Sequence, residues 1–282
     1  MLSYQHAYHA GNFADVLKHW CLQLCLDSLN RKPAAWTAYD THAGDGDYAL
    51  TEGKAAMKAE WRQGVARVWQ SREQAPTALQ SWLDAVAAQN AGAELRHYPG
   101  SPALMANALR EQDHAILCEL HPQAFPALQQ AFKRDAQVKC HFRDGFEGVM
   151  VHLPPASGRG LILIDPSYEL KDDYRRIPEW VQKALKRWRQ GLILVWYPIL
   201  EGDPHKVLID GLCRDHGWNA GLSWLRVELE RLPVRGEIRQ GLLGSGMLVI
   251  NPPWQLDEQL AAGLGWLEET LKCRATLDKK LN

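Results

Sequence analysis

Apolar residues near the start of the chain recur at intervals of three and four. Between residues 13 and 29 they occupy positions 16, 17, 20, 21, 24 and 25, which places them on one face of a helix. Asn12 directly precedes this segment and is a residue type that caps helix N-termini well. The pattern therefore predicts an amphipathic helix over residues 13–29.

Short apolar runs alternate with helical patterns along most of the remaining chain. Strands are expected at 35–39, 115–120, 138–142, 160–164, 191–196, 222–230 and 246–250, and helices at 101–110, 122–135, 145–153, 173–189 and 205–216. Nearly continuous apolar strands that alternate with helices are typical of a parallel, doubly wound α/β sheet. No helix separates the last two strands, so we expect them to form an antiparallel pair at one edge. The prediction is a seven-stranded, mostly parallel sheet.

Residues 51–95 show a mixed helical pattern and no strand pattern. In a plain dinucleotide-binding unit, an acidic residue follows the glycine turn by roughly 20 positions. Here Glu119 follows Gly44 by 75 positions (119 − 44), and the excess matches the helical stretch. We therefore expect 51–95 to be an inserted helical subdomain, with 1–50 and 96–282 forming the doubly wound domain. A lid that grips the substrate and a passive decoration are both consistent with this pattern.

Acidic residues stand at the ends of four successive expected strands: Asp40, Glu119, Asp144 and Asp165. Ligands of open α/β sheets bind beyond the carboxyl ends of the strands. A carboxylate after the second strand can accept hydrogen bonds from both hydroxyls of a ribose, and one after the third can accept from an adenine amine. The pattern indicates a cleft for an adenosyl ligand.

The tetrapeptide Asp165-Pro166-Ser167-Tyr168 directly follows the apolar run 161–164. The exocyclic nitrogen of adenine is a poor nucleophile, because its lone pair is delocalised into the ring. The Asp165 carboxylate and the Pro166 carbonyl can accept its hydrogen bonds, and the Tyr168 ring can stack on the base. Such a site works by positioning and electrostatics. We predict methyl transfer to a nucleobase amine, with Asp165, Pro166 and Tyr168 as catalytic residues.

A second segment, Asn251-Pro252-Pro253-Trp254, also follows an apolar strand. Only 28 residues follow Trp254 (282 − 254), too few for the rest of such a sheet. Asp165, in contrast, follows three earlier strand ends and precedes three further strands. We therefore expect 251–254 to be a structural turn.

Composition adds limits on compartment and partner. Apolar residues make up 46% and charged residues 23%, with no apolar run of the roughly 18 residues that a membrane span needs. Six cysteines without a CxxC pair, and no signal-peptide pattern, indicate a reduced, cytoplasmic protein. The net charge of −1 means that a polyanion would need a local basic face. Two candidates, equally typical of solvated surface, are Lys183, Lys186, Arg187 and Arg189, and Arg231, Arg235 and Arg239.

A set of motifs distributed along the chain matches one known family. The motifs are Tyr4-Gln5-His6, His9-Ala10-Gly11-Asn12, Asp15-Val16-Leu17-Lys18-His19, Asp40-Thr41-His42-Ala43-Gly44, Tyr98-Pro99-Gly100-Ser101-Pro102, Glu119-Leu120-His121-Pro122, Asp144-Gly145, 160–168, Trp196-Tyr197-Pro198 and 244–254. Together they cover the chain to about residue 270. In these motifs the chain resembles the J-type 23S ribosomal RNA adenine-N6 methyltransferases.

The resemblance implies a Rossmann-like class I methyltransferase that uses S-adenosyl-L-methionine. It implies methylation of N6 of one adenine in 23S rRNA, on free or partly assembled RNA, by a monomer without a metal or membrane association. Tyr4 and His6 would lie near the substrate base, and Asp165 would be catalytic. Ser167 replaces the family's second proline, which affects turn rigidity. Cofactor contacts would fall on Lys18, His19, His42, Ser101, Glu119, Asp144, Gly145 and Asp165.

Three other functions are compatible with a doubly wound fold. A DNA adenine-N6 methyltransferase would use the same amine chemistry, so the residues leave it open. A nicotinamide oxidoreductase requires a tight GxGxxG turn with an acid about 20 residues later, and the sequence has neither. A non-catalytic RNA-binding module is disfavoured by the intact Asp165, Pro166 and Tyr168. The N-terminal histidines lack the carboxylate or cysteine spacing of a metal site.

Overall fold

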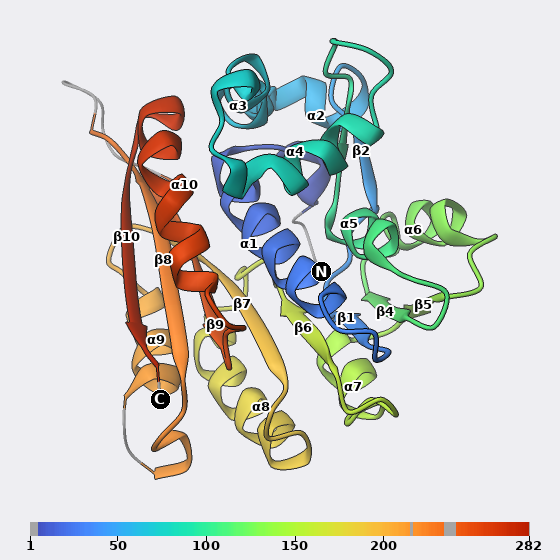
Figure 1. Ribbon diagram of the computed structural model, residues 1–282, viewed down its shortest axis with the longest axis vertical. Coiled ribbons are helices and arrows are strands. Elements are labelled where there is room, and N and C mark those ends of the chain that lie inside the picture. Colours follow the sequence, from blue (N-terminus) through green and yellow to red (C-terminus); the bar gives the residue numbers. More distant parts are fainter. Residues whose placement is uncertain (1–4, 215–216, 234–240, 282) are drawn as a thin grey trace.

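The computed structural model describes residues 5–214, 217–233 and 241–281. Its central feature is one eight-stranded sheet in the order β10-β8-β9-β7-β6-β1-β4-β5, shown in Figure 1. The strands are β1 (Thr37–Asp40), β4 (His114–Glu119), β5 (Val138–Phe142), β6 (Gly160–Ile164), β7 (Leu192–Ile199), β8 (Trp224–Arg231), β9 (Gly244–Ile250) and β10 (Cys273–Lys280). All seven expected strands are present, which confirms the α/β class.

The strand count differs from the prediction at one edge. β5, β4, β1, β6 and β7 run parallel, β9 pairs antiparallel with both β7 and β8, and β10 pairs antiparallel with β8. The predicted antiparallel pair of β8 and β9 is confirmed, but the edge strand is β10. The seven-stranded prediction was wrong because β10 alternates small or apolar residues with charged ones and lacks an apolar run.

Later strands of the chain lie on both sides of β1 in the sheet. β4 and β5 extend to one side of β1, and β6 and β7 extend to the other. The connections therefore diverge between β1 and β6, and a crevice is expected at the carboxyl ends of these two strands. Asp40 ends β1, and Asp165 follows the last residue of β6. Topology thus places the DPSY segment at the switch point.

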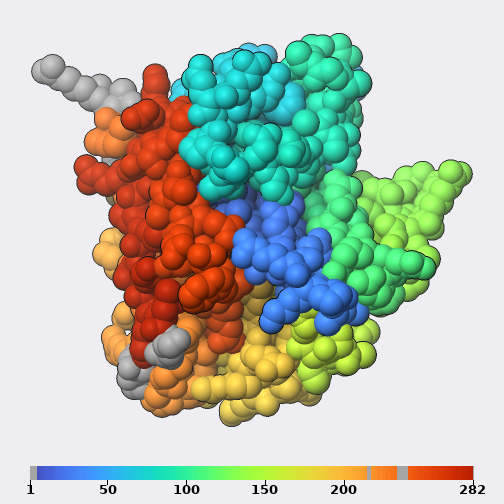
Figure 2. All heavy atoms as spheres, in the orientation of Figure 1, coloured from blue at the N-terminus to red at the C-terminus, as the bar shows by residue number. Residues whose placement is uncertain are grey.

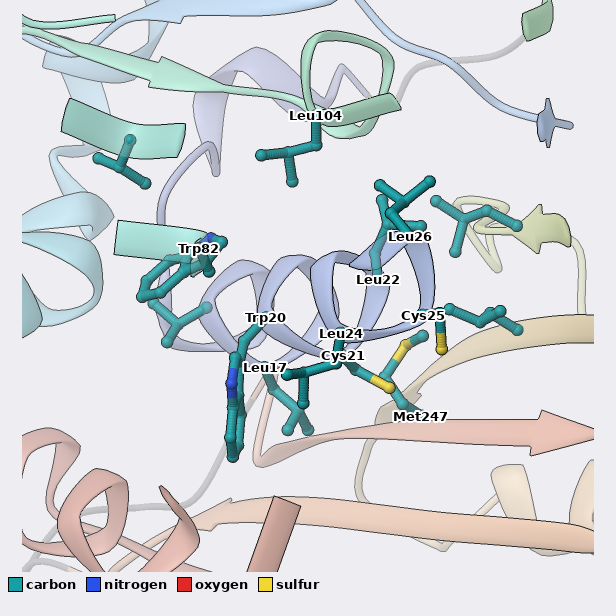
Figure 3. Close-up of a cluster of buried hydrophobic side chains, with 14 of the residues drawn as sticks. Leu17, Trp20, Cys21, Leu22, Leu24, Cys25, Leu26, Trp82, Leu104 and Met247 are labelled. Carbon is teal, nitrogen blue, oxygen red and sulfur yellow. The ribbon is translucent and has the colours of Figure 1, made fainter. Parts of the chain in front are cut away.

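Helix α1 (Phe13–Asn30) fills the space between the sheet and the outer helices on one face. Asn12 caps it, as predicted, since its Oδ1 accepts hydrogen bonds of 3.0 Å from the backbone N–H groups of Ala14 and Asp15. Figure 3 shows Cys21 and Cys25 directed toward Met247 of β9, while Leu22 and Leu26 lie on another side of the helix. Every residue from Ala14 to Leu26 is buried, so the helix is enclosed on all sides and the prediction of an amphipathic helix was wrong. This burial anchors the N-terminal segment against the sheet.

The remaining main-domain helices cover both faces of the sheet. The five expected helices are present with slightly shorter bounds, and α10 was not anticipated. Side chains of α5, α6 and α10 join the core cluster that contains α1, and side chains of α7, α8 and α9 join the cluster on the opposite face. Their bounds are α5 (Ser101–Ala108), α6 (Phe125–Phe132), α7 (Gly145–Met150), α8 (Asp173–Arg187), α9 (His205–Cys213) and α10 (Leu256–Leu271).

The segment 51–95 is helical, as the sequence indicates. It contains α2 (Gly53–Lys58), α3 (Val65–Gln70), α4 (Thr77–Ala88) and two 3-10 turns, Glu60–Gln63 and Arg72–Gln74. A small antiparallel ribbon of β2 (Asp47–Ala49) and β3 (His97–Pro99) closes its base. α4 packs on α1 and α10, and Figure 2 shows the cyan atoms of this unit directly against the blue and red ones. The inserted helices therefore share the core of the main domain.

The segment 251–254 forms a turn, as predicted. Asn251 has a left-handed φ of +52°, and its amide donates hydrogen bonds to the carbonyls of Arg189 and Gly191. Ile250, just before it, pairs with Ile193 at the start of β7. The turn thus lies at the opposite end of the sheet from Asp165. Among the described residues, no helix is long and apolar enough to cross a membrane.

Candidate active site

Two cavities meet at the carboxyl end of β6. The first contains about 980 Å³ and the second about 660 Å³ of space between protein atoms, open solvent included. His6, Asp165 and Ser167 line both of them. Of the predicted residues, His42, Glu119, Asp144, Gly145 and Pro166 line the first cavity, and Lys18 and Tyr168 line the second. Asp165 therefore stands at the junction of the two spaces.

A buried ammonium group connects Asp165 to helix α1. Lys18 Nζ lies 2.6 Å from Oδ2 of Asp165 and 2.8 Å from Oδ1 of Asp15, one turn earlier on α1. Oδ2 of Asp15 also accepts a hydrogen bond from the backbone N–H of Gly11 and lies 3.0 Å from Nε2 of His6. No hydrogen bond to Oδ1 of Asp165 comes from the described part of the chain. One oxygen of the carboxylate is fixed, and the other remains able to accept.

Burial and charge act in opposite directions on this cluster. Burial raises the pKa of Asp165, and the Lys18 ammonium and His6 oppose the rise. Burial alone would lower the pKa of Lys18, but Asp15 and Asp165 raise it well above its usual range. The pKa of Asp15 is lowered because His6 and Lys18 outweigh its burial. Lys18 is therefore charged at neutral pH and holds two carboxylates together.

Glu119 joins the end of β4 to the glycine turn after β1. Its Oε2 accepts a hydrogen bond from the backbone N–H of Gly44 at 2.7 Å, and its Oε1 accepts from that of His121 at 2.6 Å. Burial raises its pKa, and these two N–H groups oppose the rise. Each oxygen of a carboxylate has two acceptor positions, so one remains on each toward the first cavity.

Asp144 caps α7 at the far wall of the first cavity. Oδ1 accepts from the backbone N–H of Glu147 at 3.1 Å, and Oδ2 accepts from the Arg176 guanidinium at 3.1 Å. Burial raises the pKa of Asp144, but these donors outweigh it, and the pKa falls below its ordinary value. The Arg176 guanidinium also lies 4.5 Å from the ring centroid of Phe146. An acceptor, a cation and an apolar ring thus face one space.

His42 is the neutral member of this wall. Burial lowers its pKa to about 4, so its imidazole is uncharged at neutral pH. Its Nδ1 lies 2.8 Å from the Thr41 hydroxyl, and its ring packs edge-on against Phe146. A neutral imidazole beside an apolar ring suits an uncharged heterocycle better than an anion.

Two aromatic rings, Tyr168 and Trp196, line the second cavity together with polar and aliphatic side chains. Tyr168 has a left-handed φ of +54°, and its hydroxyl donates a 2.6 Å hydrogen bond to the carbonyl of Trp196. Its ring packs against Tyr174 at 4.7 Å between centroids, and Lys18 Nζ lies 5.7 Å from the Trp196 ring centroid. Pro198, Leu200 and Leu242 complete the apolar lining. The space suits a flat aromatic ring.

Three predicted residues do not line either cavity or lie outside the described chain. His19 is buried, and its Nδ1 lies 2.8 Å from the Tyr98 hydroxyl. The buried Ser101 hydroxyl donates a 2.6 Å hydrogen bond to Oδ2 of Asp40, which is itself fully buried. Tyr4 lies outside the described residues. The cofactor roles of His19 and Ser101 and the substrate role of Tyr4 therefore stay predictions.

Several site residues escaped the sequence reasoning. Phe146 follows a predicted acidic strand end by two positions and could have been found from that spacing. Arg176 comes from α8, and Trp196 comes from the middle of β7, so only the folded chain brings them to the cavities. Asp15 was noted as a motif letter, but its link to Asp165 through Lys18 joins residues 150 positions apart (165 − 15).

Comparisons with known proteins agree with this geometry. Residues 33–280 match the family model described as "Ribosomal RNA large subunit methyltransferase D, RlmJ". Two curated relatives carry the name "Ribosomal RNA large subunit methyltransferase J". The one from Escherichia coli (strain K12) is 41% identical, and the one from Haemophilus influenzae is 39% identical. Each match covers 96% of this chain and 94% of the relative.

A solved structure supports the fold over the same length. The crystal structure of a Legionella pneumophila protein superposes with a TM-score of 0.87 at 32% identity. The match covers 96% of this chain and 98% of that one. The family model covers the strand ends that carry Glu119, Asp144 and Asp165. The chain belongs to the RlmJ family of ribosomal RNA large subunit methyltransferases.

Proposed function

We propose that this chain transfers a methyl group from S-adenosylmethionine to the exocyclic N6 amine of an adenine in 23S rRNA, giving N6-methyladenine. The observation that carries the proposal is the position of Asp165. Its carboxylate lies between a cavity that contains the Glu119 and Asp144 acceptors and a cavity that contains the Tyr168 and Trp196 rings. The names of the relatives supply the class of RNA.

The first cavity fits the methyl donor. S-adenosylmethionine, when bound, supplies an electrophilic methyl group on a sulfonium. Glu119 keeps an acceptor position on each oxygen for the ribose hydroxyls, and Asp144 with Gly145 would hold the adenine end beside Phe146. His42 would contact the same ligand without adding charge.

Lys18, His19 and Ser101 would support the first cavity from outside its lining. Lys18 holds Asp165 in place at the junction. We propose that Ser101 and His19 act as positioning residues, because they bond to Asp40 and Tyr98 and do not line the cavity.

The second cavity would receive the target base. An amine N–H would donate to Oδ1 of Asp165, since Lys18 occupies Oδ2, and the Pro166 carbonyl would accept the other. The Tyr168 ring, fixed by its bond to the Trp196 carbonyl, would stack on the base. As the methyl carbon leaves the sulfonium sulfur and bonds to N6, a neutral thioether remains and positive charge develops on the nitrogen, which then loses one proton to solvent. Two carboxylates around one ammonium leave a net negative charge to stabilise it.

Ser167 stands where the family pattern has a second proline, and the turn at Tyr168 has other contacts that support it. The left-handed φ of Tyr168 is held by its hydroxyl bond and by Tyr174. We propose that the substitution affects the rate and leaves the reaction type unchanged.

We also propose that the RNA is free or partly assembled 23S rRNA, and that the protein acts as a cytoplasmic monomer with Tyr4 and His6 near the base. The rival substrate is DNA. The first test offers RNA and DNA of the same sequence to the protein and measures methyl incorporation. The second maps methylated nucleotides in rRNA from cells with and without the protein. Methylation of the RNA and loss of one adenine modification are expected. Equal or greater activity on the DNA would overturn the proposal.

A further inference from the structure

The inserted helices reach the wall of the second cavity through Glu60. His9 and Asn12 line that cavity. Nδ1 of His9 lies 2.9 Å from Oε2 of Glu60, and the amide of Asn12 donates to the same oxygen at 3.2 Å. The backbone N–H of Val65 donates to the carbonyl of Gly11 at 2.8 Å. The turn that carries Glu60 is therefore fixed directly to the residues around the proposed base site.

Two exposed cations stand on either side of Glu60 in this turn. Lys58 Nζ lies 3.3 Å from Nε2 of His9 and 5.9 Å from the ring centroid of Tyr8. The Arg62 guanidinium lies 5.6 Å from the ring centroid of Trp61. The tautomer of His9 that satisfies both neighbours carries its proton on Nδ1, donates to Glu60 and accepts from Lys58. The cation is thereby held at the edge of the cavity.

Neither cation has a carboxylate partner among residues 5–214, 217–233 and 241–281. Lys58 and Arg62 form no ion pair there, and the Glu60 carboxylate between them is engaged by His9 and Asn12. Burial raises the pKa of Glu60, but the hydrogen bonds from His9 and Asn12, together with the charges of His9 and Lys58, outweigh it and lower the pKa. Exposed cations next to aromatic rings are the combination that single-stranded nucleic acid binds. The two cations carry positive charge, and Lys58 contacts His9, which lines the proposed base site.

The basic run on α8 lacks these features, and Arg235 and Arg239 of the remaining run lie outside the described residues. Lys183 and Lys186 are exposed on α8, whose first residue, Asp173, lines the first cavity. At a rise of 1.5 Å per residue, they lie roughly 15 and 20 Å farther along the helix. No aromatic ring lies beneath them in the described residues. They carry the same charge and provide a matched control.

We propose that Lys58 and Arg62 of the inserted helical unit bind the phosphates that flank the target adenosine of the RNA. The inference rests on the proposed function, because the base in the second cavity determines where those phosphates lie. It assigns the 51–95 subdomain a substrate-gripping role. Glu60 acts as a positioning residue, because its bonds to His9 and Asn12 fix the segment that carries the two cations next to the second cavity.

The test uses the full-length protein and an unmodified 23S rRNA transcript. Four proteins are compared: wild type, Lys58→Ala/Arg62→Ala, the charge-retaining Lys58→Arg/Arg62→Lys, and the control Lys183→Ala/Lys186→Ala. RNA affinity is measured from about 50 to about 200 mM salt, together with kcat/KM for methylation and the affinity for S-adenosylmethionine. Loss of two phosphate contacts should weaken RNA binding about tenfold and flatten the slope of log K against log salt by about 1.4.

The expected pattern is a loss in the Ala/Ala variant, retention in the charge-retaining variant and the control, and unchanged cofactor affinity throughout. RNA binding by the Ala/Ala variant that matches the control would overturn the proposal. A parallel loss of cofactor affinity would also overturn it, because the effect would then be structural. If the wild-type protein binds the transcript but does not methylate it, the proposed function is overturned. The RNA-binding role of Lys58 and Arg62 would then still stand.

Discussion

Replacing Lys18 by methionine should destabilise the fold strongly. Lys18 is 3% exposed, and the two carboxylates it pairs with, Asp15 and Asp165, are 2% and 12% exposed. Methionine keeps most of the apolar stem but removes the ammonium, so two buried carboxylates lose their cation. Removing one partner of a buried ion pair costs about 3–5 kcal/mol. We expect the free energy of unfolding at pH 8 to fall by about 4 kcal/mol.

The pH dependence of this loss has a definite sign. Without Lys18, burial raises the pKa of Asp165 further above its unfolded value. A raised folded pKa contributes stability that is present below the unfolded pKa and is lost as the pH rises through the folded pKa. The deficit of Lys18→Met should therefore be larger at pH 8 than at pH 5.

Urea unfolding followed by tryptophan fluorescence at both pH values measures this deficit. Lys183→Met, on the exposed face of α8, serves as the control and should change the free energy of unfolding by less than about 0.5 kcal/mol. Adding Asp165→Asn to Lys18→Met should recover part of the loss, because one buried charge disappears. A deficit below about 1 kcal/mol that is equal at both pH values would refute the account of this cluster.

Three further predictions concern the cofactor, the pH response and the N-terminus. Glu119→Ala should weaken S-adenosylmethionine binding roughly 10- to 100-fold by calorimetry, since it removes charged acceptors; unchanged affinity would remove the ribose role. Burial raises the pKa of Asp40 to about 7, so its neutral form stabilises the fold below about pH 4, and this stability is lost as the pH rises through 7. Asp40→Asn should abolish this pH dependence, which amounts to at most about 1.4 kcal/mol in the free energy of unfolding per pH unit. Urea unfolding across this pH range measures it, and an unaltered profile would contradict the assignment to Asp40. Deleting residues 1–6 should reduce methyl transfer more than cofactor affinity, and equal losses would argue against a substrate-side N-terminus.

Periodicity alone located most of the sheet and the first helix. α1 was predictable because its apolar spacing and its Asn12 cap are local signals. β6 and β7 were predictable because strands buried on both faces read as continuous apolar runs. β10 was not, because an edge strand with exposed charged residues resembles a polar tail. The prediction failed at β10, because a strand that is buried on only one face leaves a weak hydrophobic pattern.

Part of the candidate site was also predictable from sequence and part was not. Glu119, Asp144 and Asp165 could be placed together from sequence because parallel strands bring their carboxyl ends to one edge. The fourth acid, Asp40, points instead into the core, where it accepts from Ser101. Lys18 was predicted as a cofactor contact, and that role stays a prediction; its pairing with Asp15 and Asp165 was not foreseen. Such pairings depend on side chains far apart in sequence, and no local pattern encodes them.

The contact between Glu60 and the N-terminal segment was equally hidden. Glu60 is an ordinary charged letter in a polar helical stretch, and only the folded chain brings it to His9 and Asn12. The sequence left open whether the 51–95 unit grips substrate or merely decorates the fold. The link to the second cavity favours the first alternative.

The central claim is that the Asp165 carboxylate directs a methyl group to the N6 amine of adenine in 23S rRNA. The most direct measurement incubates an unmodified 23S rRNA transcript and S-adenosylmethionine with wild-type protein or Asp165→Ala, then identifies the modified nucleosides by mass spectrometry. The account predicts N6-methyladenosine at one position with wild type and none with the variant, whose fold and tryptophan fluorescence stay intact. Full activity of Asp165→Ala, or methylation at an atom other than N6, would contradict it.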